Sequence, residues 1–421
     1  MYKLENFYIK FELKTILQYC LVILAILQCN TVFFREYGTN HSKIVILLFI
    51  IIMIALFVLS FIESIKKRMN LKPLLIFLLS FGSLLIIFLV ISYIRRRYSL
   101  TSIFPLLIPL FMVPIMYVDY KNGEADQILQ RFKNIIVFLA VLSLIFWLLA
   151  LLGFETSITK MVSWGGVRAV YGYSFLHYIS QGSVSFLGLP SVIRNTGLFV
   201  EAPMYSYILC MAMLVSIFLK DNNNSFSWKT WVLMATILTT TSTTGVIIMA
   251  ISIFVKLTFF NEKTHVSIKA FLIVLLIPIL FFIISSVLNK KVDENWYSSS
   301  SIRYNDFVAG FLAWKDHPWL GNGFGNYNIL VNNMDYRRLI GNFNTGFSTG
   351  FMEILAYGGI AAGLYYLLPT CLSPLKNKKI FAVSGISFLL FVFTLVNDVY
   401  AYYLFISYFW LAVLTLNKGD Y

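Results

Sequence analysis

The sequence is dominated by long apolar runs, and these runs constrain its fold more than any other feature. Apart from Lys269, uncharged runs long enough to cross about 30 Å of hydrocarbon occupy residues 15–34, 44–62, 73–94, 98–118, 134–154, 202–219, 267–289, 354–375, 380–397 and 399–417. Hydrophobic residues make up 59% of the 421 residues and charged residues only 12%, about half the charged share of a soluble domain. No aqueous fold could cover so much apolar surface, which excludes a soluble multidomain enzyme, a disordered regulator and a nucleic-acid-binding domain. We therefore predict an all-α polytopic membrane protein in which residues 1–421 form a single integral membrane domain.

Residues 230–255 form a further uncharged run that is long for one membrane span and short for two. Its middle, residues 239–245, consists of hydroxyl-bearing side chains followed by glycine. Such a segment suits a broken helix whose freed backbone groups bond to side chains or water. We predict that the chain turns back near Ser242, which gives about twelve transmembrane helices.

The charge distribution supports this turn. The chain carries a net charge of +14, and with a break near Ser242 both termini and most Lys and Arg residues lie in the cytoplasm, as the positive-inside rule requires. An unbroken helix would place Lys376, Lys378 and Lys379 outside. The arginine triplet at 95–97 falls on the outer side, where it either gathers an anionic lipid-linked substrate or anchors the chain to outer-leaflet phosphates.

Two long polar stretches, about 155–201 and 290–353, lie on the outer face in this arrangement. Loops of this length are seldom simple connectors. Both are rich in Tyr, Trp, Asn and Gly, which stack on sugar rings and hydrogen-bond to their hydroxyls but are also common at membrane interfaces. Their charged candidates for a site are Arg168, His177, Arg194, Glu201, Arg303, Asp306, His317, Asp335, Arg337 and Arg338.

The sequence offers no pattern for a metal or a cofactor. The four cysteines lie in or beside apolar runs, no helix carries two histidines at metal spacing, and no carboxylates cluster. The glycine-rich segment 321–325 follows no strand, which argues against a dinucleotide site. We expect neither metal nor cofactor, so any reaction must use the side chains of the protein itself.

Several segments in and beside the polar stretches resemble a known family. Residues 194–203 read Arg-Asn-Thr-Gly-Leu-Phe-Val-Glu-Ala-Pro, and residues 301–303 read Ser-Ile-Arg. Residues 317–327 read His-Pro-Trp-Leu-Gly-Asn-Gly-Phe-Gly-Asn-Tyr, and the segment that closes at Glu353 is followed by Ala-Tyr-Gly-Gly-Ile at 356–360. In this order and on one membrane face, these strings resemble motifs of the O-antigen polymerase and O-antigen ligase superfamily of bacterial membrane glycosyltransferases.

The resemblance implies transfer of a glycan from a polyprenyl pyrophosphate donor to a sugar hydroxyl, at an active site on the outer face of the cytoplasmic membrane. Arginine suits the leaving pyrophosphate because its planar fork binds phosphate oxygens and stays protonated. Arg194 and Arg303 are therefore the first catalytic candidates. His317 serves either in catalysis or as a loop cap, and Glu201 either pairs with Arg194 or acts as a base.

The remaining candidates are assigned to contacts outside the reaction itself. Arg168, His177, Arg337 and Arg338 are expected to be solvated or to contact the glycan as substrate-binding residues. Glu353 is expected to cap the helix that begins near it.

A departure from the family pattern bears on which reaction is catalysed. Ligases of this group usually carry a His that activates the acceptor hydroxyl about nine residues before the position of Glu353. This chain has Asn344 there, which we group with the substrate-binding residues, and an amide cannot act as a general base at neutral pH. The segment 242–245 also lacks the Arg that many relatives carry.

We therefore favour a polymerase that joins lipid-linked repeat units of O-antigen or capsule. An O-antigen ligase is the nearest rival. A transporter of lipid-linked sugars is the third interpretation, and it is disfavoured because the predicted spans are nearly free of charge. The expected partners are a polyprenyl-pyrophosphate-linked oligosaccharide, membrane lipids and a chain-length regulator protein, with no nucleic acid.

Overall fold

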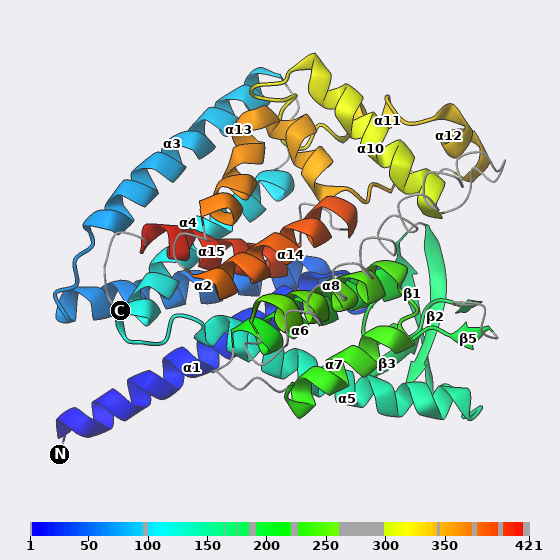
Figure 1. Ribbon diagram of the computed structural model, residues 1–421, viewed down its shortest axis with the longest axis horizontal. Coiled ribbons are helices and arrows are strands. Elements are labelled where there is room, and N and C mark those ends of the chain that lie inside the picture. The colour runs from blue at the N-terminus through cyan, green and yellow to red at the C-terminus, as the bar shows by residue number, and fades with distance from the viewer. Residues whose placement is uncertain are drawn as a thin grey trace.

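Helices form at every predicted apolar run that lies in the described part of the chain (Figure 1). This computed structural model describes residues 2–95, 100–164, 166–173, 175–184, 191–219, 226–260, 299–342, 346–372, 377–394 and 399–415. The first half contains α1 (Tyr2–Gln28), α2 (His41–Lys66), α3 (Lys72–Ile94), α4 (Leu100–Lys121) and α5 (Gln127–Leu151). The second half contains α6 (Ala202–Phe218), α7 (Trp228–Thr239), α8 (Thr243–Phe259), α10 (Ser299–Asp316), α11 (Tyr327–Val331), α12 (Tyr336–Asn342), α13 (Gly350–Leu372), α14 (Lys378–Thr394) and α15 (Tyr400–Leu414).

The lengths of these helices fit a polytopic membrane protein. By length and composition, α2, α3, α4, α5 and α13 can each cross a membrane, and α1, α6, α8 and α15 contain shorter apolar helices. The outward faces of α2 and α3 expose large apolar side chains, as lipid-facing helices do. The predicted span at 267–289 lies outside the described residues, so the number of twelve spans stays a prediction.

The all-α prediction is wrong for the first long polar stretch, which folds into short strands at one end of the helix bundle (Figure 1). β1 (Ile158–Ser163), β2 (Val167–Tyr173) and β3 (His177–Ile179) form an antiparallel sheet in the order β1-β2-β3, and β4 (Ser183–Val184) pairs with β5 (Val192–Ile193). β1 and β2 are rich in β-branched and aromatic residues, which favour strands over helices. A small core of Val32, Val162, Val170, Tyr178 and Val200 packs beneath this sheet.

The predicted helix break near Ser242 is confirmed. α7 ends at Thr239 and α8 begins at Thr243, and the two helices contact one another. Thr241 between them adopts a left-handed φ of 50°, and the Ser242 side chain caps α8 by accepting a hydrogen bond from the backbone N–H of Gly245 (3.4 Å). The chain therefore reverses at this point instead of continuing as one long helix.

The glycine-rich loop that follows α10 docks directly onto the backbone of α13. The backbone N–H of Gly323 donates to the carbonyl of Tyr357 (2.9 Å), and the N–H of Ile360 donates to the carbonyl of Pro318 (2.8 Å). α13 is interrupted at Gly359, which has a φ of 63° and frees backbone groups for these bonds. A Cβ atom on Gly359 would strike the backbone of Trp319. The glycines of this motif thus permit close backbone contact.

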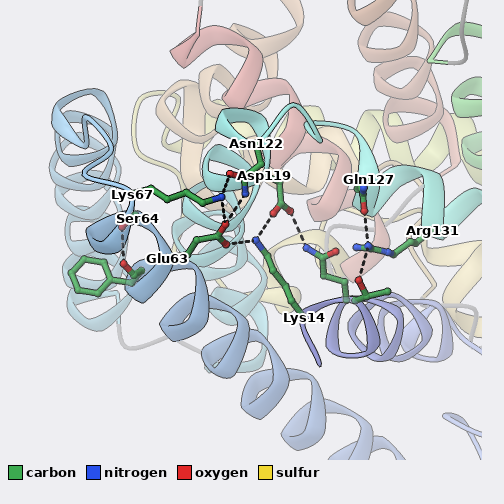
Figure 2. A network of polar contacts seen from close by, with 11 residues as sticks. Lys14, Glu63, Ser64, Lys67, Asp119, Asn122, Gln127 and Arg131 are labelled. Carbon is green, nitrogen blue, oxygen red and sulfur yellow. Dashed lines mark hydrogen bonds and ion pairs between the residues drawn. The ribbon is translucent and has the colours of Figure 1, made fainter. Parts of the chain in front are cut away.

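A network of charged and amide side chains ties together α1, α2 and α4 near the end of the bundle opposite the strands (Figure 2). The Lys14 ammonium group lies 3.0 Å from a carboxylate oxygen of Glu63 and 2.6 Å from one of Asp119. Lys67 and Asn122 each donate a hydrogen bond of 2.8 Å to Glu63. Because each carboxylate has a cationic partner, these partly buried charges are compensated, as such charges in membrane proteins must be.

Candidate active site

Glu201 stands at the strand end of the bundle, as the residue before the first turn of α6. α6 is central, and nearly all of its side chains are buried. The carboxylate of Glu201 lies within electrostatic reach of three arginines, Arg168, Arg194 and Arg303. These four residues come from β2, from the segment after β5, from the start of α6 and from α10, so the fold gathers them from distant parts of the sequence.

The break between α7 and α8 positions two of these arginines. Arg194 donates from Nε to the carbonyl oxygen of Thr240 (3.1 Å), which the break leaves without a helical partner. Arg303 donates to the hydroxyl of Thr244 at the start of α8 (2.9 Å). The backbone N–H of the buried Asn195 donates to the carbonyl of Thr239 (3.0 Å) and fixes the same turn. The freed groups of the broken helix are therefore satisfied by the site itself, as predicted.

The sheet contributes the third arginine and a tryptophan. Arg168 on β2 donates to the carbonyl of Val200 (3.1 Å), and its buried Nε has no hydrogen-bond partner among the described residues. The Trp164 side chain hydrogen-bonds to Glu201. The guanidinium of Arg35 covers the Trp164 ring at 4.9 Å from the centroid, which holds the indole in place.

The three guanidinium groups retain most of their hydrogen-bonding capacity. Each has five N–H donors, and within the described part of the chain each donates one hydrogen bond to the protein, at Val200, Thr240 or Thr244. None of the three closes an ion pair with Glu201 among the described residues. Backbone carbonyls hold Arg168 and Arg194, and the Thr244 hydroxyl holds Arg303. Three cations near one carboxylate, with N–H donors left over among the described contacts, can bind an anion with several oxygens.

Burial changes the pKa values of the charged groups in this site. It raises the pKa of Glu201, and the hydrogen bond from Trp164 and the charges of the arginines act in the opposite direction. Burial lowers the pKa of Arg194, which the negative charge of Glu201 partly offsets. Burial also lowers the pKa of Arg303, which the charges of Asp306 and then Glu201 partly offset. A carboxylate with a raised pKa is suited to accepting a proton, and arginine stays charged despite such a decrease.

Two other predicted site residues have structural roles. Arg338 is buried and pairs with the fully buried Asp306 (2.6 Å), contrary to the expectation that it is solvated or contacts glycan. The same Asp306 carboxylate accepts hydrogen bonds from the backbone and the hydroxyl of Ser348 (2.9 and 2.6 Å), so this pair fastens α12 and the segment before α13 to α10. Arg337 is more exposed and pairs with Asp335 (2.9 Å).

His177 is fully buried, which differs from the prediction that it is solvated. Its ring lies near Phe146 of α5 and Tyr173, and neither ring nitrogen has a hydrogen-bond partner among the described residues. Burial lowers the pKa of His177 to about 4, which keeps the imidazole neutral. The residue packs the sheet against the bundle.

His317 lies far from the arginine group. It follows α10, and at 1.5 Å per residue it stands roughly 20 Å along this helix from Arg303. Its ring contacts Arg95 at the end of α3. The structure thus separates His317 from Arg194, Arg303 and Glu201, contrary to a shared catalytic site. Glu353 lies in the first turn of α13, as expected of a capping residue, and Asn344 lies outside the described residues.

Sequence reasoning missed two residues that organise the site. Trp164 lies in the turn between β1 and β2, and its signal is the Trp-Gly-Gly hairpin between β-branched segments. Thr244 was recognised as part of a helix break, but its contact with Arg303 joins positions 59 residues apart. In the described residues, no group of three or more His, Cys, Asp or Glu side chains could hold a metal ion.

The fold is that of a polytopic membrane protein, with three arginines gathered around Glu201 at one end of the bundle. A sequence model of the O-antigen ligase family matches residues 228–367, about one third of the chain, so this segment is similar to that family. The match includes Arg303 and the docked glycine loop but begins after Arg194 and Glu201. No curated protein matches the chain.

Proposed function

We propose that the chain is a bacterial surface polysaccharide polymerase of the cytoplasmic membrane, with its active site on the outer face. It transfers a glycan from a polyprenyl pyrophosphate donor to a lipid-linked repeat unit of O-antigen or capsule. The observation that supports this most directly is the group of three arginines around Glu201, whose N–H donors are mostly unused among the described residues. Membrane lipids and a chain-length regulator protein complete the expected partners.

The reaction assigned to this site is a displacement at the anomeric carbon of the donor sugar. The bond from that carbon to the pyrophosphate oxygen breaks, and the bond to the acceptor hydroxyl oxygen forms. The arginines bind the leaving pyrophosphate and stabilise its growing negative charge. Glu201 takes the proton of the acceptor hydroxyl, and burial supports this role by raising its pKa.

A ligase that attaches finished glycan to lipid A core is the second candidate, and the description of the matched family favours it. The polymerase is preferred because the sequence has Asn344 where ligases of the superfamily place a His. Both reactions use the same donor, so the arginine group serves either one. The difference lies in the acceptor.

Reconstitution separates the two functions. We expect purified protein in neutral lipid vesicles to convert polyprenyl-pyrophosphate repeat units into a ladder of polymers without lipid A and without added metal. Loss of the ladder on addition of a chelator would contradict the proposed use of arginine as the only cation. In cells, deletion of the gene should leave single repeat units on their terminal acceptor, whereas undecorated lipid A beside intact lipid-linked polymer would point to the ligase.

A further inference from the structure

A second basic pair lies at the far end of α10 from the arginine group. The two terminal nitrogens of Arg95 lie 2.7 and 3.1 Å from the two ring nitrogens of His317. A guanidinium has only donors, and a neutral imidazole has only one acceptor nitrogen. In either neutral tautomer of His317, one ring nitrogen carries a hydrogen. At that nitrogen an imidazole N–H faces a guanidinium N–H, and no hydrogen bond can form. A protonated imidazole adds a second unmatched donor. The contact is exposed, so in every state the pair offers N–H donors to an anion or to water.

The pair is flanked by exposed apolar and aromatic side chains, and the exposed Lys315 and Asp316 directly precede His317. Tyr93 is 72% exposed and Trp319 is 71% exposed, and Ile94 and Leu320 are also exposed. Exposed Tyr and Trp beside aliphatic side chains are typical of the boundary between hydrocarbon and lipid headgroups. A phosphate attached to a lipid would reach Arg95 at this depth by lateral diffusion, without leaving the membrane.

The pair lies on the same side of the bundle as the arginine group. α3 begins beside the polar network of α2 and α4, where the Tyr117 hydroxyl donates to the carbonyl of Asn70 (2.8 Å), and it ends at Arg95. α10 joins the two basic sites, with Arg303 near its start and His317 just after its end. Their separation of roughly 20 Å along the helix is of the size of a short oligosaccharide.

We infer that Arg95 and His317 form a second phosphate site, which binds the pyrophosphate of the lipid-linked acceptor. The inference rests on the proposed polymerase function, in which both substrates are lipid-linked. The donor pyrophosphate leaves at the arginine group, so the acceptor must place its terminal sugar hydroxyl there. The pyrophosphate of the acceptor then lies one repeat unit from the arginine group. The Arg95–His317 pair lies at a similar distance from that group and offers N–H donors to the pyrophosphate.

An equilibrium titration measures how many pyrophosphate molecules the protein binds, and it requires no catalytic turnover. The full chain is placed in nanodiscs of neutral phosphatidylcholine and titrated with farnesyl pyrophosphate, a soluble isoprenyl pyrophosphate. We expect two bound equivalents for the wild type, one for Arg95→Ala, one for Arg303→Ala and none for the double variant. Lys43→Ala, which removes an exposed cation at the start of α2, is the matched control and should retain two.

Each outcome decides the inference. Two equivalents bound by Arg95→Ala would overturn it. The count should also hold when the nanodiscs contain phosphatidylglycerol, and loss of one equivalent under that condition would assign the pair to bulk anionic lipid instead. In the polymerisation assay, Arg95→Ala should raise the KM for the lipid-linked acceptor at least tenfold. The KM for the same oligosaccharide without its pyrophosphate and lipid should be equal in Arg95→Ala and the wild type, since that acceptor lacks the group that Arg95 binds. A wild type that binds two equivalents but makes no polymer would contradict the proposed function and not the second site.

Discussion

At the scale of single residues, the carboxyl group of Glu201 is expected to set the pH dependence of the reaction. The base must be deprotonated to act, and burial raises its pKa. The value of kcat/KM should therefore fall on acidification through a pKa above the ordinary Glu value of about 4.3. Glu201→Gln should lower the rate about a hundredfold or more above this pKa, and it should remove the acidic limb of the profile. A Gln variant with the wild-type profile would remove Glu201 from catalysis.

His177 is expected to make the protein sensitive to acid for a different reason. Its pKa is near 6.5 in the unfolded chain and about 4 in the fold, so between these values the unfolded state binds more protons. Stability should be fully present above pH 6.5 and decrease as the pH falls toward 4, by about 3 kcal/mol in total. Thermal unfolding in detergent should show this decrease, and His177→Phe should flatten it while retaining the aromatic packing. An unchanged pH profile in the Phe variant would contradict the account.

At the scale of elements, the contact between the glycine loop and α13 depends on the absence of a side chain at Gly359. Gly359 has a positive φ, and a Cβ atom there would strike the Trp319 backbone. We expect Gly359→Ala to destabilise the protein by at least about 2 kcal/mol. Gly82→Ala in α3 is the matched control, because its Cβ would have no atom within 4 Å, and it should be neutral or slightly stabilising. Equal melting temperatures for the two variants would refute the docking role.

The elements differed in how well the sequence predicted them. Helical spans were predictable because a membrane forces uncharged runs to satisfy their backbone groups internally, and the break at Ser242 was predictable from its hydroxyl-rich composition. The strands between Ile158 and Ile193 were missed because they are short and interrupted, and their pairing depends on contacts with the connection between α1 and α2. The glycine motif at 321–325 had a visible pattern, but its partner on α13 is distant in sequence.

At the scale of the whole molecule, the turn at Ser242 fixes which loops share a side of the membrane. In a background in which the exposed Cys371 is replaced by Ser, Tyr336→Cys on α12 and Asn377→Cys before α14 provide exposed reporters. An impermeant maleimide should label position 336 and not position 377 in intact cells. The reverse pattern would overturn the topology, and permeabilised cells, in which both positions should react, serve as the control.

The three-dimensional fold also explains why some residues of the candidate active site could be predicted from the sequence and others could not. Arg194, Arg303 and Glu201 were candidates from the sequence because they lie in motifs that resemble the superfamily and because arginine suits a leaving pyrophosphate. The structure brings these three together. His177 and Arg338 were misassigned because residue type alone does not reveal burial, which the sheet and Asp306 impose on them. The contact between Arg95 and His317 could not be predicted, since it joins residues 222 positions apart.

The central claim is that Arg194 and Arg303 bind the leaving pyrophosphate of the donor. Arg303 is the sharper test, since its one hydrogen bond within the described part of the chain, to Thr244, makes it a minor contributor to folding. The measurement is the polymerisation rate of purified Arg303→Ala and Arg303→Lys in lipid vesicles, at matched protein amount and confirmed thermal stability. The account predicts a loss of about a hundredfold or more for Ala and partial recovery for Lys, because a point charge cannot reproduce the bidentate geometry of arginine. Wild-type activity in the Ala variant would contradict it.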